Sequence, residues 1–256
     1  MNKIPKISII TVAFNSVKTI QDTIESILIQ DYNNIEYIII DAGSSDGTVE
    51  IIKSFGDKIT YFISESDNGI YDGMNKGIIA ASGDLIGILN SDDFYPNNFI
   101  LSNVAKTFVG NQCDAVYGDL VYVKEFDKNK TVRYWQAGDY SALKLKRGWM
   151  LPHPTFFVKK SIYEKYGLYD TKLKRAADYD MILKLLYKYN ISVKYIPMIL
   201  VTMRMGGASN SSLINRIRAN KEDGLAWTKN QLNKPMFIRI KKPLQKVRQF
   251  FLKPNI

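Results

Sequence analysis

Short apolar runs alternate with amphipathic stretches through the first ninety residues of the chain. The runs are rich in β-branched side chains, and they have the length of strands that are buried on both faces. They occupy residues 7–13, 35–40, 59–63 and 85–89. The stretches between them repeat apolar residues at helical spacing. This alternation predicts an α/β fold, in which right-handed crossovers join parallel strands and helices cover both faces of the sheet.

The pattern changes after residue 93, and the second half is expected to be α+β in character. The expected elements are a helix at 96–108, strands at 116–123 and 131–135, a helix at 178–189 and a short strand at 193–196. The two alternating strands predict an antiparallel hairpin around the polar turn 127–130. The glycine and serine residues within 206–212 predict a flexible loop or hinge.

Two of the predicted buried strands run directly into acidic residues. Asp41 follows the strand at 35–40, and Asp92 and Asp93 follow the strand at 85–89. Because parallel sheets bind ligands at the carboxyl ends of their strands, these carboxylates are expected to share one rim. Their oxygens suit Mg²⁺ or Mn²⁺, ions that also bind phosphates. The alternative is a solvated turn at Asp92 and Asp93, with a local Asx turn at Asp41.

Composition narrows the classes of protein that remain. The single cysteine, Cys113, cannot form a disulfide within the chain, and no cysteine and histidine residues occur at zinc-ligand spacing. A reduced, intracellular chain is therefore expected. The formal net charge is +10, but residues 233–256 hold seven basic residues and no acid, so the remainder carries only +3. The tail is therefore the part expected to bind anions, either membrane phosphates or nucleic acid. Alternatively, its charge serves solubility.

Several blocks of the sequence resemble those of glycosyltransferase family 2, in the same order and spacing. They are SIITVAFN at 8–15, IIDAGSSDGT at 39–48, ESDNGIYDGMNKG at 65–77, LNSDD at 89–93, HPTFF at 153–157, AADYD at 176–180 and RMGGAS at 204–209. The form GIYDGMNKG is similar to that of the members that build bacterial surface polysaccharides such as O-antigen, colanic acid and capsule. The resemblance implies the GT-A fold and inverting transfer of a sugar from a nucleotide-sugar donor.

The resemblance also implies how the chain is divided and what it binds. Residues 1–115 are expected to form the nucleotide-sugar-binding half of one GT-A domain, and residues 116–205 its acceptor-binding half. Residues 206–256 are expected to form a flexible loop and basic amphipathic C-terminal helices. The expected donor is a UDP-sugar, with dTDP as the other carrier considered. The expected acceptor is a glycan hydroxyl, carried on a polyprenyl diphosphate.

The resemblance assigns donor binding to three residues of the first half. Phe14 is expected to stack on the base and Asp41 to accept from the base's N–H edge, which suits a uracil or thymine ring. Packing of Phe14 in the core is the alternative. Asn75 is expected near the ribose or a phosphate.

Asp92 and Asp93 correspond to the family's metal-binding motif, so the resemblance implies a Mg²⁺ or Mn²⁺ cofactor held by these two acids. The ion stabilises the negative charge that develops on the departing diphosphate. Asparagine stands at position 90, where many relatives carry aspartate. Because one carboxylate is missing, the ligand set is open, and one of the two acids is alternatively a contact of the donor sugar or ribose.

The resemblance assigns the reaction's base to Asp178, at the start of the helix predicted from that residue. An N-terminal helix acid that the macrodipole favours is the alternative. His153 is the single histidine and lies between two prolines. It is expected either to contact the donor phosphates or the acceptor, or to be structural. Arg204 is expected to clamp the diphosphate as the neighbouring glycine-rich loop closes, with a solvated arginine as the alternative.

The basic tail has an amphipathic pattern. Apolar and basic residues fall largely on opposite sides of a helical wheel over residues 236–253, although Pro243 interrupts the pattern. This predicts an interfacial helix on an anionic membrane, or an apolar face that packs on the domain or on a partner. No apolar run approaches the roughly 18 residues of a membrane span. The expected location is cytoplasmic and peripheral, on the inner face of the plasma membrane.

Two other classes of protein fit parts of the sequence. The net charge of +10 and the 12% of aromatic residues suit a nucleic-acid-binding protein, but the charge is confined to the tail and no nucleic-acid-binding motif occurs. A dinucleotide-dependent oxidoreductase would share the layered fold. Its glycine-rich turn is missing after the first strand, where residues 12–16 read VAFNS. A glycosyltransferase that binds no nucleic acid is therefore expected.

Overall fold

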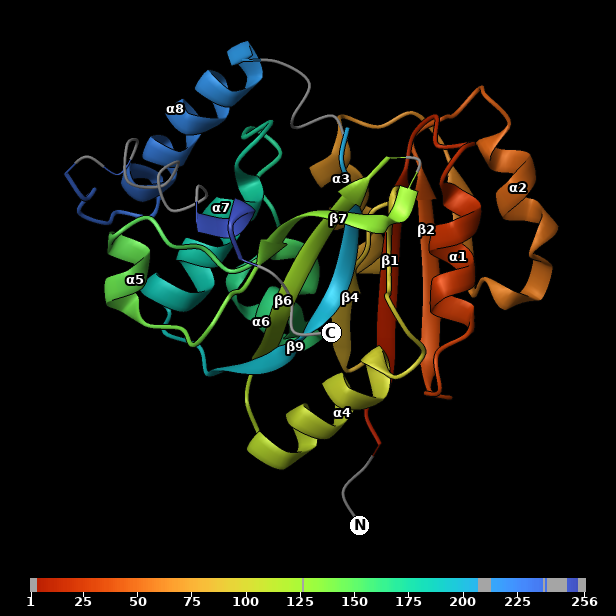
Figure 1. Cartoon of the computed structure of the whole chain (residues 1–256), viewed down its shortest axis with the longest axis horizontal. Coiled ribbons are helices and arrows are strands. Elements are labelled where there is room, and N and C mark those ends of the chain that lie inside the picture. The colour runs from red at the N-terminus through yellow and green to blue at the C-terminus, as the bar shows by residue number, and fades with distance from the viewer. Residues whose placement is uncertain (1–3, 126, 207–212, 237, 239–247, 253–256) are drawn as a thin grey trace.

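The computed structural model describes residues 4–125, 127–206, 213–236, 238 and 248–252. Across these residues one mixed sheet runs in the order β3-β2-β1-β4-β8-β6-β9-β5, with β7 paired to β6 (Figure 1). The strands are β1 (Ile7–Ala13), β2 (Ile35–Asp41), β3 (Tyr61–Ser64), β4 (Leu85–Ile88), β5 (Asp93–Phe94), β6 (Ala115–Lys124), β7 (Asp127–Trp135), β8 (Phe157–Lys159) and β9 (Val193–Arg204). This mixed α/β sheet confirms the predicted fold class.

Helices lie on both faces of the sheet. They are α1 (Ile20–Leu28), α2 (Thr48–Ser54), α3 (Ile70–Ala80), α4 (Ile100–Asn111), α5 (Ala142–Lys146), α6 (Lys160–Tyr166), α7 (Ala177–Ile182) and α8 (Leu213–Lys229), with the shorter turns η1 (Gly56–Lys58), η2 (His153–Thr155) and η5 (Arg248–Phe250) and the π-helix η3 (Leu183–Lys188). In Figure 1, α1 and α2 stand at one end of the sheet and α5 and α8 at the other.

The first four strands form the parallel part of the sheet, as predicted. β1 pairs with β2 and with β4, and β2 pairs with β3, all in parallel. Ile7 and Ile9 of β1 pack with apolar side chains of α1, α2 and α4, whereas Ile10 and Val12 pack with those of α3. Both faces of β1 are therefore buried, which explains its uninterrupted apolar run.

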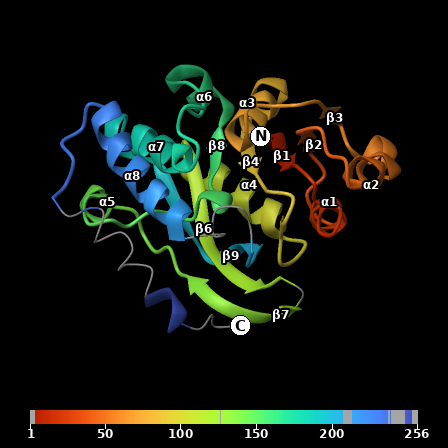
Figure 2. The ribbon, with the colours of Figure 1, turned by 90° about the horizontal axis from the view of Figure 1, so that it is seen from above.

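The second half continues the same sheet with mixed pairing. β8 is antiparallel to both β4 and β6, and β9 runs parallel to β6. Seen from above, β6 and β7 curve away from the parallel strands (Figure 2). In this second half, α8 packs on α7. The Trp227 indole donates to the Tyr179 hydroxyl at 3.0 Å, and the Asn230 side-chain amide donates to Asp180 at 2.7 Å. A donor half and an acceptor half of the chain remain a prediction.

Two elements begin at other residues than the pattern predicts. α4 begins at Ile100 rather than at 96, because the Gln30 side-chain oxygen accepts from the Ile100 and Leu101 amides at 3.1 Å each and so caps the helix there. β7 begins at Asp127, which pairs with Lys124, so the predicted polar turn at 127–130 is wrong. Those residues are the exposed start of a strand.

The strand predicted at 193–196 is much longer, because β9 runs from Val193 to Arg204. Pro197 interrupts the apolar pattern. The pairing with β6 is irregular at this point, since Gly118 pairs with Ile196 and the next residue, Asp119, pairs with Ile199. Proline has no backbone N–H to donate to the neighbouring strand. The irregular pairing places Pro197 outside the regular hydrogen-bond pattern, so the strand can continue to Arg204.

Much of the predicted flexible loop and of the predicted tail helix lies outside the described residues. Of the loop 206–212 the structure describes Gly206, and of the tail it describes 233–236, 238 and 248–252. Within that part, η5 packs on β7, where the Gln249 side-chain oxygen accepts from Arg133 Nε at 2.7 Å. The Phe250 ring lies 5.4 Å from the same guanidinium. This end of the tail therefore packs against the domain.

Candidate active site

The rim at the carboxyl ends of β1, β2 and β4 carries the predicted donor residues. β1 lies between the other two strands, and Ala13 at its end pairs with Asp41 at the end of β2. Phe14 follows directly and is 61% exposed. Core packing therefore does not explain this aromatic side chain. Its ring is open to stacking by a planar ligand.

Asp41 is fully buried beneath the loop that follows β2. Its carboxylate accepts from the Gly43 amide at 3.1 Å, the Ser44 amide at 2.9 Å, the Ser44 hydroxyl at 2.5 Å and the Ser64 hydroxyl at 2.6 Å. The alternative interpretation as a local turn acceptor therefore holds in this structure. Both oxygens of Asp41 are thus already hydrogen-bonded. A base N–H that binds Asp41 directly would have to displace a serine hydroxyl.

The turn after β4 separates its two acids. Asp92 is partly exposed at the rim, whereas Asp93 is completely buried. The Asn90 amide donates to Asp93 Oδ2 at 3.2 Å, and the Asp93 amide donates to the Asn90 carbonyl at 3.0 Å. Burial, and then the charge of Asp92, raises the pKa of Asp93 well above its usual range. Burial also raises the pKa of Asp92.

Contacts from α1 and the loop before it hold this turn in place. The Thr23 hydroxyl donates to the carbonyls of Ser91 at 3.0 Å and Asp93 at 2.7 Å. The Ser16 hydroxyl lies 2.7 Å from that of Ser91. These bonds hold the backbone of the turn in place, and with it the position of the partly exposed Asp92.

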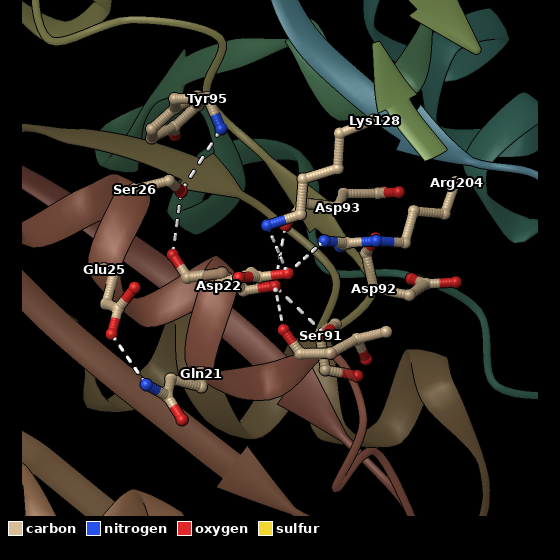
Figure 3. Close-up of polar contacts among 12 residues, drawn as sticks. Gln21, Asp22, Glu25, Ser26, Ser91, Asp92, Asp93, Tyr95, Lys128 and Arg204 are labelled. Atoms are coloured by element: carbon tan, nitrogen blue, oxygen red, sulfur yellow. Dashed lines mark hydrogen bonds and ion pairs between the residues drawn. The ribbon is translucent and has the colours of Figure 1, made fainter. Parts of the chain in front are cut away.

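The Arg204 guanidinium lies next to this turn and points toward Asp22 (Figure 3). Its guanidinium is 4% exposed, donates to the Asp92 carbonyl at 2.8 Å, pairs with the Asp22 carboxylate and lies 4.8 Å from the centre of the Phe94 ring. Lys128 of β7 pairs with the same carboxylate at 2.6 Å. The solvated alternative for Arg204 is therefore wrong, whereas a clamp on the diphosphate stays a prediction that would require this buried side chain to leave its partners. Its charge is buried and already neutralised.

Asn75 has a structural role in the fold. Its side-chain nitrogen donates to the Tyr169 carbonyl at 2.9 Å, and its side-chain oxygen accepts from the Tyr169 amide at 2.9 Å. These two bonds tie α3 to the loop before α7. A contact of Asn75 with the ribose or a phosphate stays a prediction, and it would have to replace one of these bonds.

Asp178 lies at the start of α7 with its side chain partly exposed. The Tyr71 hydroxyl of α3 donates to Asp178 Oδ1 at 3.2 Å. His153 contacts the Tyr169 hydroxyl through Nε2 at 3.3 Å, with the two rings edge to face. Burial lowers the pKa of His153, although the Asp178 charge opposes this, so the imidazole is neutral at pH 7. A neutral imidazole fits an acceptor-side or structural role better than a phosphate contact.

Tyr122 of β6 is a buried phenol whose ring centre lies 4.5 Å from the Arg133 guanidinium carbon. Burial raises the pKa of Tyr122, Arg133 opposes this, and the charges of Asp93 and Asp178 raise it further. The described site thus has the carboxylate turn after β4 and the partly exposed carboxylate of Asp178 at the start of α7.

The turn after β4 is the place where a divalent cation fits. In the described part of the chain, Asn90 Oδ1 and Asp93 Oδ1 are buried without a hydrogen-bond partner, and Asp92 offers an accessible carboxylate beside them. No group of three or more histidine, cysteine, aspartate or glutamate side chains suited to a metal occurs among the described residues. A hard cation that takes one or two carboxylates and completes its shell with substrate phosphates matches this donor set.

Two contact residues of the site were not predicted. Asp22 lies on α1 among polar residues, and its partners Lys128 and Arg204 are more than a hundred positions away, so no local pattern marks it. Tyr71 falls inside the block ESDNGIYDGMNKG, which the resemblance singles out. That block is a signal that could have found it.

A mixed sheet with acids at the carboxyl ends of its parallel strands and a further carboxylate nearby is the architecture of a GT-A transferase. The chain matches the family model described as Glycosyl transferase family 2 over residues 8–167. It therefore belongs to this family and is a glycosyltransferase, as the sequence resemblance implies.

Known relatives and solved structures agree with this family. An uncharacterized glycosyltransferase of Mycobacterium tuberculosis is 32% identical over 189 residues, which cover 72% of this chain and 70% of the relative. The crystal structure of S. aureus TarS 1-349 in complex with UDP-GlcNAc has a TM-score of 0.71 at 18% identity and covers 92% of this chain and 69% of that one. Of a longer TarS chain, this protein spans 44%.

A second solved structure shares the fold. The mannosyltransferase PcManGT from Pyrobaculum calidifontis, in complex with GDP-Man and Mn2+, has a TM-score of 0.67 at 17% identity and covers 98% of this chain and 71% of that one. Within the residues that the structure describes, no helix combines the length and the apolarity that crossing a membrane requires.

Proposed function

We propose that this glycosyltransferase moves a sugar, with inversion, from a UDP-sugar to a hydroxyl of a glycan acceptor. The observation that carries the proposal is the turn after β4, where the partly exposed carboxylate of Asp92 lies beside the buried Asn90 Oδ1 and Asp93 Oδ1, which have no hydrogen-bond partner in the described part of the chain. The turn that holds Asp92 serves the leaving diphosphate, and Asp178 serves the acceptor. The complex of TarS with UDP-GlcNAc supports a nucleotide-sugar donor of the UDP type.

The base end of the donor lies at Phe14. Its exposed ring, 61% accessible, stacks on the uracil, and such stacking contributes about 1–3 kcal/mol per base. The uracil N–H reaches Asp41 Oδ1 in place of the Ser44 hydroxyl that bonds it at 2.5 Å. Exchange of one donor for another keeps the buried carboxylate satisfied, so the contact costs little.

The diphosphate end of the donor lies at the turn after β4. Asp92 would hold Mg²⁺ or Mn²⁺ together with oxygens of the diphosphate, and the bound ion supplies positive charge where the leaving group becomes more negative. Asn90 Oδ1 and Asp93 Oδ1 are buried close to Asp92 and have no hydrogen-bond partner among the described residues. The complex of the mannosyltransferase with Mn2+ supports a divalent cofactor. This assigns the ion to Asp92, with Asp93 as its support.

Asp178 acts as the general base. Its carboxylate takes the proton from the acceptor hydroxyl while the oxygen attacks C1 of the donor sugar, on the side opposite the diphosphate. The new C1–O bond forms as the C1–O bond to phosphate breaks, and the electron pair leaves with UDP. Base assistance of this kind contributes roughly 10² to 10⁴ in rate. One displacement inverts, so an α-linked donor yields a β-linked product.

The acceptor is proposed to be a saccharide on a polyprenyl diphosphate, in the synthesis of a surface polysaccharide at the cytoplasmic face of the plasma membrane. Seven basic residues in 233–256, and the exposed side chains of Met236 and Phe251 at 75% and 80%, support contact with an anionic lipid surface. Burial of Ile238 and the contact of Gln249 with Arg133 support packing of other parts of the tail on the domain. The tail would thus bridge the domain and the membrane.

A panel of UDP-, dTDP- and GDP-sugars, incubated with the protein with and without EDTA, tests the proposal. Release of the nucleoside diphosphate is followed by chromatography, and the first sugar anomer formed by slow hydrolysis is identified by proton NMR. We expect a UDP-sugar to be cleaved, EDTA to stop the reaction and Mn²⁺ to restore it. An α-linked donor should give the β-anomer first.

Other results would contradict specific parts of the proposal. Cleavage of a GDP- or dTDP-sugar alone would refute the UDP assignment, and full activity in EDTA would refute the divalent ion. Initial formation of the α-anomer from an α-linked donor would refute inversion.

A further inference from the structure

Tyr71 donates a hydrogen bond to the proposed base, Asp178. Its hydroxyl lies 3.2 Å from Asp178 Oδ1, although the two residues are 107 positions apart. Tyr71 belongs to the first turn of α3 and is 8% exposed. Burial, and then the charge of Asp178, raises the pKa of Tyr71 above its usual range, so the phenol stays protonated throughout any assay range. It can only donate to the carboxylate.

A stack of rings fixes the position of Tyr71. Its ring lies 5.8 Å from that of Tyr169, at an interplanar angle of 20°. Tyr169 is 5% exposed, its backbone is bonded twice to Asn75 of the same helix as Tyr71, and its hydroxyl contacts His153. The ring of Tyr163 lies 6.2 Å from that of Tyr169. The phenol of Tyr71 therefore has little freedom to move away from Asp178.

We propose that Tyr71 is a positioning residue for the base: its hydroxyl holds Asp178 Oδ1 so that Oδ2 faces the acceptor hydroxyl. The inference rests on the proposed role of Asp178. A carboxylate at the start of a helix can rotate about its Cα–Cβ and Cβ–Cγ bonds, and a bond from a rigid donor selects one rotamer. The bond occupies Oδ1 and leaves Oδ2 free of this donor.

Several ionisable groups face Asp178 from the elements packed around it. They are Tyr71 from α3, Tyr122 from β6, His153 from η2 and Tyr169 from the loop before α7, with Glu222 of α8 acting on Tyr71. The phenols do not ionise at acid pH. His153 does, so any pH effect of Tyr71 has to be separated from the titration of this imidazole.

The test is the variant Tyr71→Phe, which removes one oxygen and keeps the ring stack. We expect kcat to fall roughly tenfold to a hundredfold, the range of a hydrogen bond to a charged group, while KM for the donor stays unchanged. An unchanged KM separates this effect from a general disturbance of the site, and the same fall in kcat should occur in a His153→Gln background.

Tyr163→Phe is the matched control, since it also removes one buried phenol oxygen, and that phenol contacts Tyr169 rather than Asp178. Its kcat should equal that of the wild type. Wild-type kcat in Tyr71→Phe would overturn the inference. So would an equal fall of kcat in Tyr163→Phe.

A second measurement does not need turnover. Losses of melting temperature in Tyr71→Phe, Asp178→Asn and the double variant should be non-additive, because the two side chains share one bond. Additive losses would overturn the contact. An inactive wild type, or a fully active Asp178→Asn, would instead overturn the proposed function, so the two failures are distinguishable.

Discussion

Substitution of Asp22 by asparagine should lower the free energy of unfolding, and it changes a residue to which we assign no ligand contact. The change removes one negative charge and keeps the size of the side chain. Arg204 then remains buried, with the Asp92 carbonyl at 2.8 Å and the Phe94 ring at 4.8 Å as neighbours. It loses the carboxylate that pairs with it directly, and the charges of Asp92 and Asp93 still act on it. The effect therefore measures how far this ion pair supports the turn that carries Asp92.

The magnitude follows from the burial of the two partners. Loss of one member of a buried ion pair costs about 3–5 kcal/mol. The Arg204 side chain is 4% exposed but that of Asp22 is 32% exposed, so water compensates part of the loss. We expect the free energy of unfolding to fall by about 2 kcal/mol. In a chain of this size the melting temperature then falls by roughly 4–8 °C.

Lys128→Ala is the matched control, because Lys128 pairs with the same carboxylate from a side chain that is 50% exposed. An exposed pair contributes about 0–1 kcal/mol, so this variant should melt within roughly 4 °C of the wild type. Scanning calorimetry of the three proteins gives the comparison. A melting temperature of Asp22→Asn within about 1 °C of the wild type would refute the reasoning, as would an equal loss in Lys128→Ala.

Three further predictions concern the donor and the membrane. Asp92→Asn should lower the affinity for UDP with Mn²⁺ by about tenfold or more and leave the metal-free affinity unchanged, and equal titrations in calorimetry would contradict the metal assignment. Phe14→Ala should raise the donor KM by roughly 5- to 150-fold with little change in kcat, and an unchanged KM would remove the stacking contact. Deletion of residues 239–256 should release the protein from anionic vesicles in a sedimentation assay, and undiminished sedimentation would end the role of the tail.

The parts of the fold that could be predicted are those that local patterns determine. β1 is buried on both faces and reads as a continuous apolar run, and α3 (Ile70–Ala80) lies between the third and fourth apolar runs, where helical spacing is predicted. The start of α4 depends on Gln30, which lies about seventy positions earlier and caps it. β9 continues past Pro197 because its pairing with β6 is irregular there, with extra residues in β9. Neither feature is visible in a local window.

The same distinction between local patterns and distant contacts applies to the candidate site. The roles that the resemblance assigns to Asp92 and Asp178 stay predictions, and Phe14 is exposed as base stacking requires. The resemblance could not show that Arg204 pairs with an acid 182 positions away, or that Asn75 bonds a backbone 94 positions away. Such partners satisfy a polar side chain that would otherwise be assigned to a ligand, and they are known only once the chain is folded.

Single-turnover transfer by Asp178→Asn, measured together with its affinity for UDP, tests the central claim most directly. The structure keeps Asp178 apart from Phe14 and Asp92 in sequence and in element, so loss of the base should leave donor binding intact. We expect the rate of sugar transfer to fall by roughly 10² to 10⁴ while the affinity for UDP in Mn²⁺ stays within about twofold of the wild type. A transfer rate equal to that of the wild type would contradict the account.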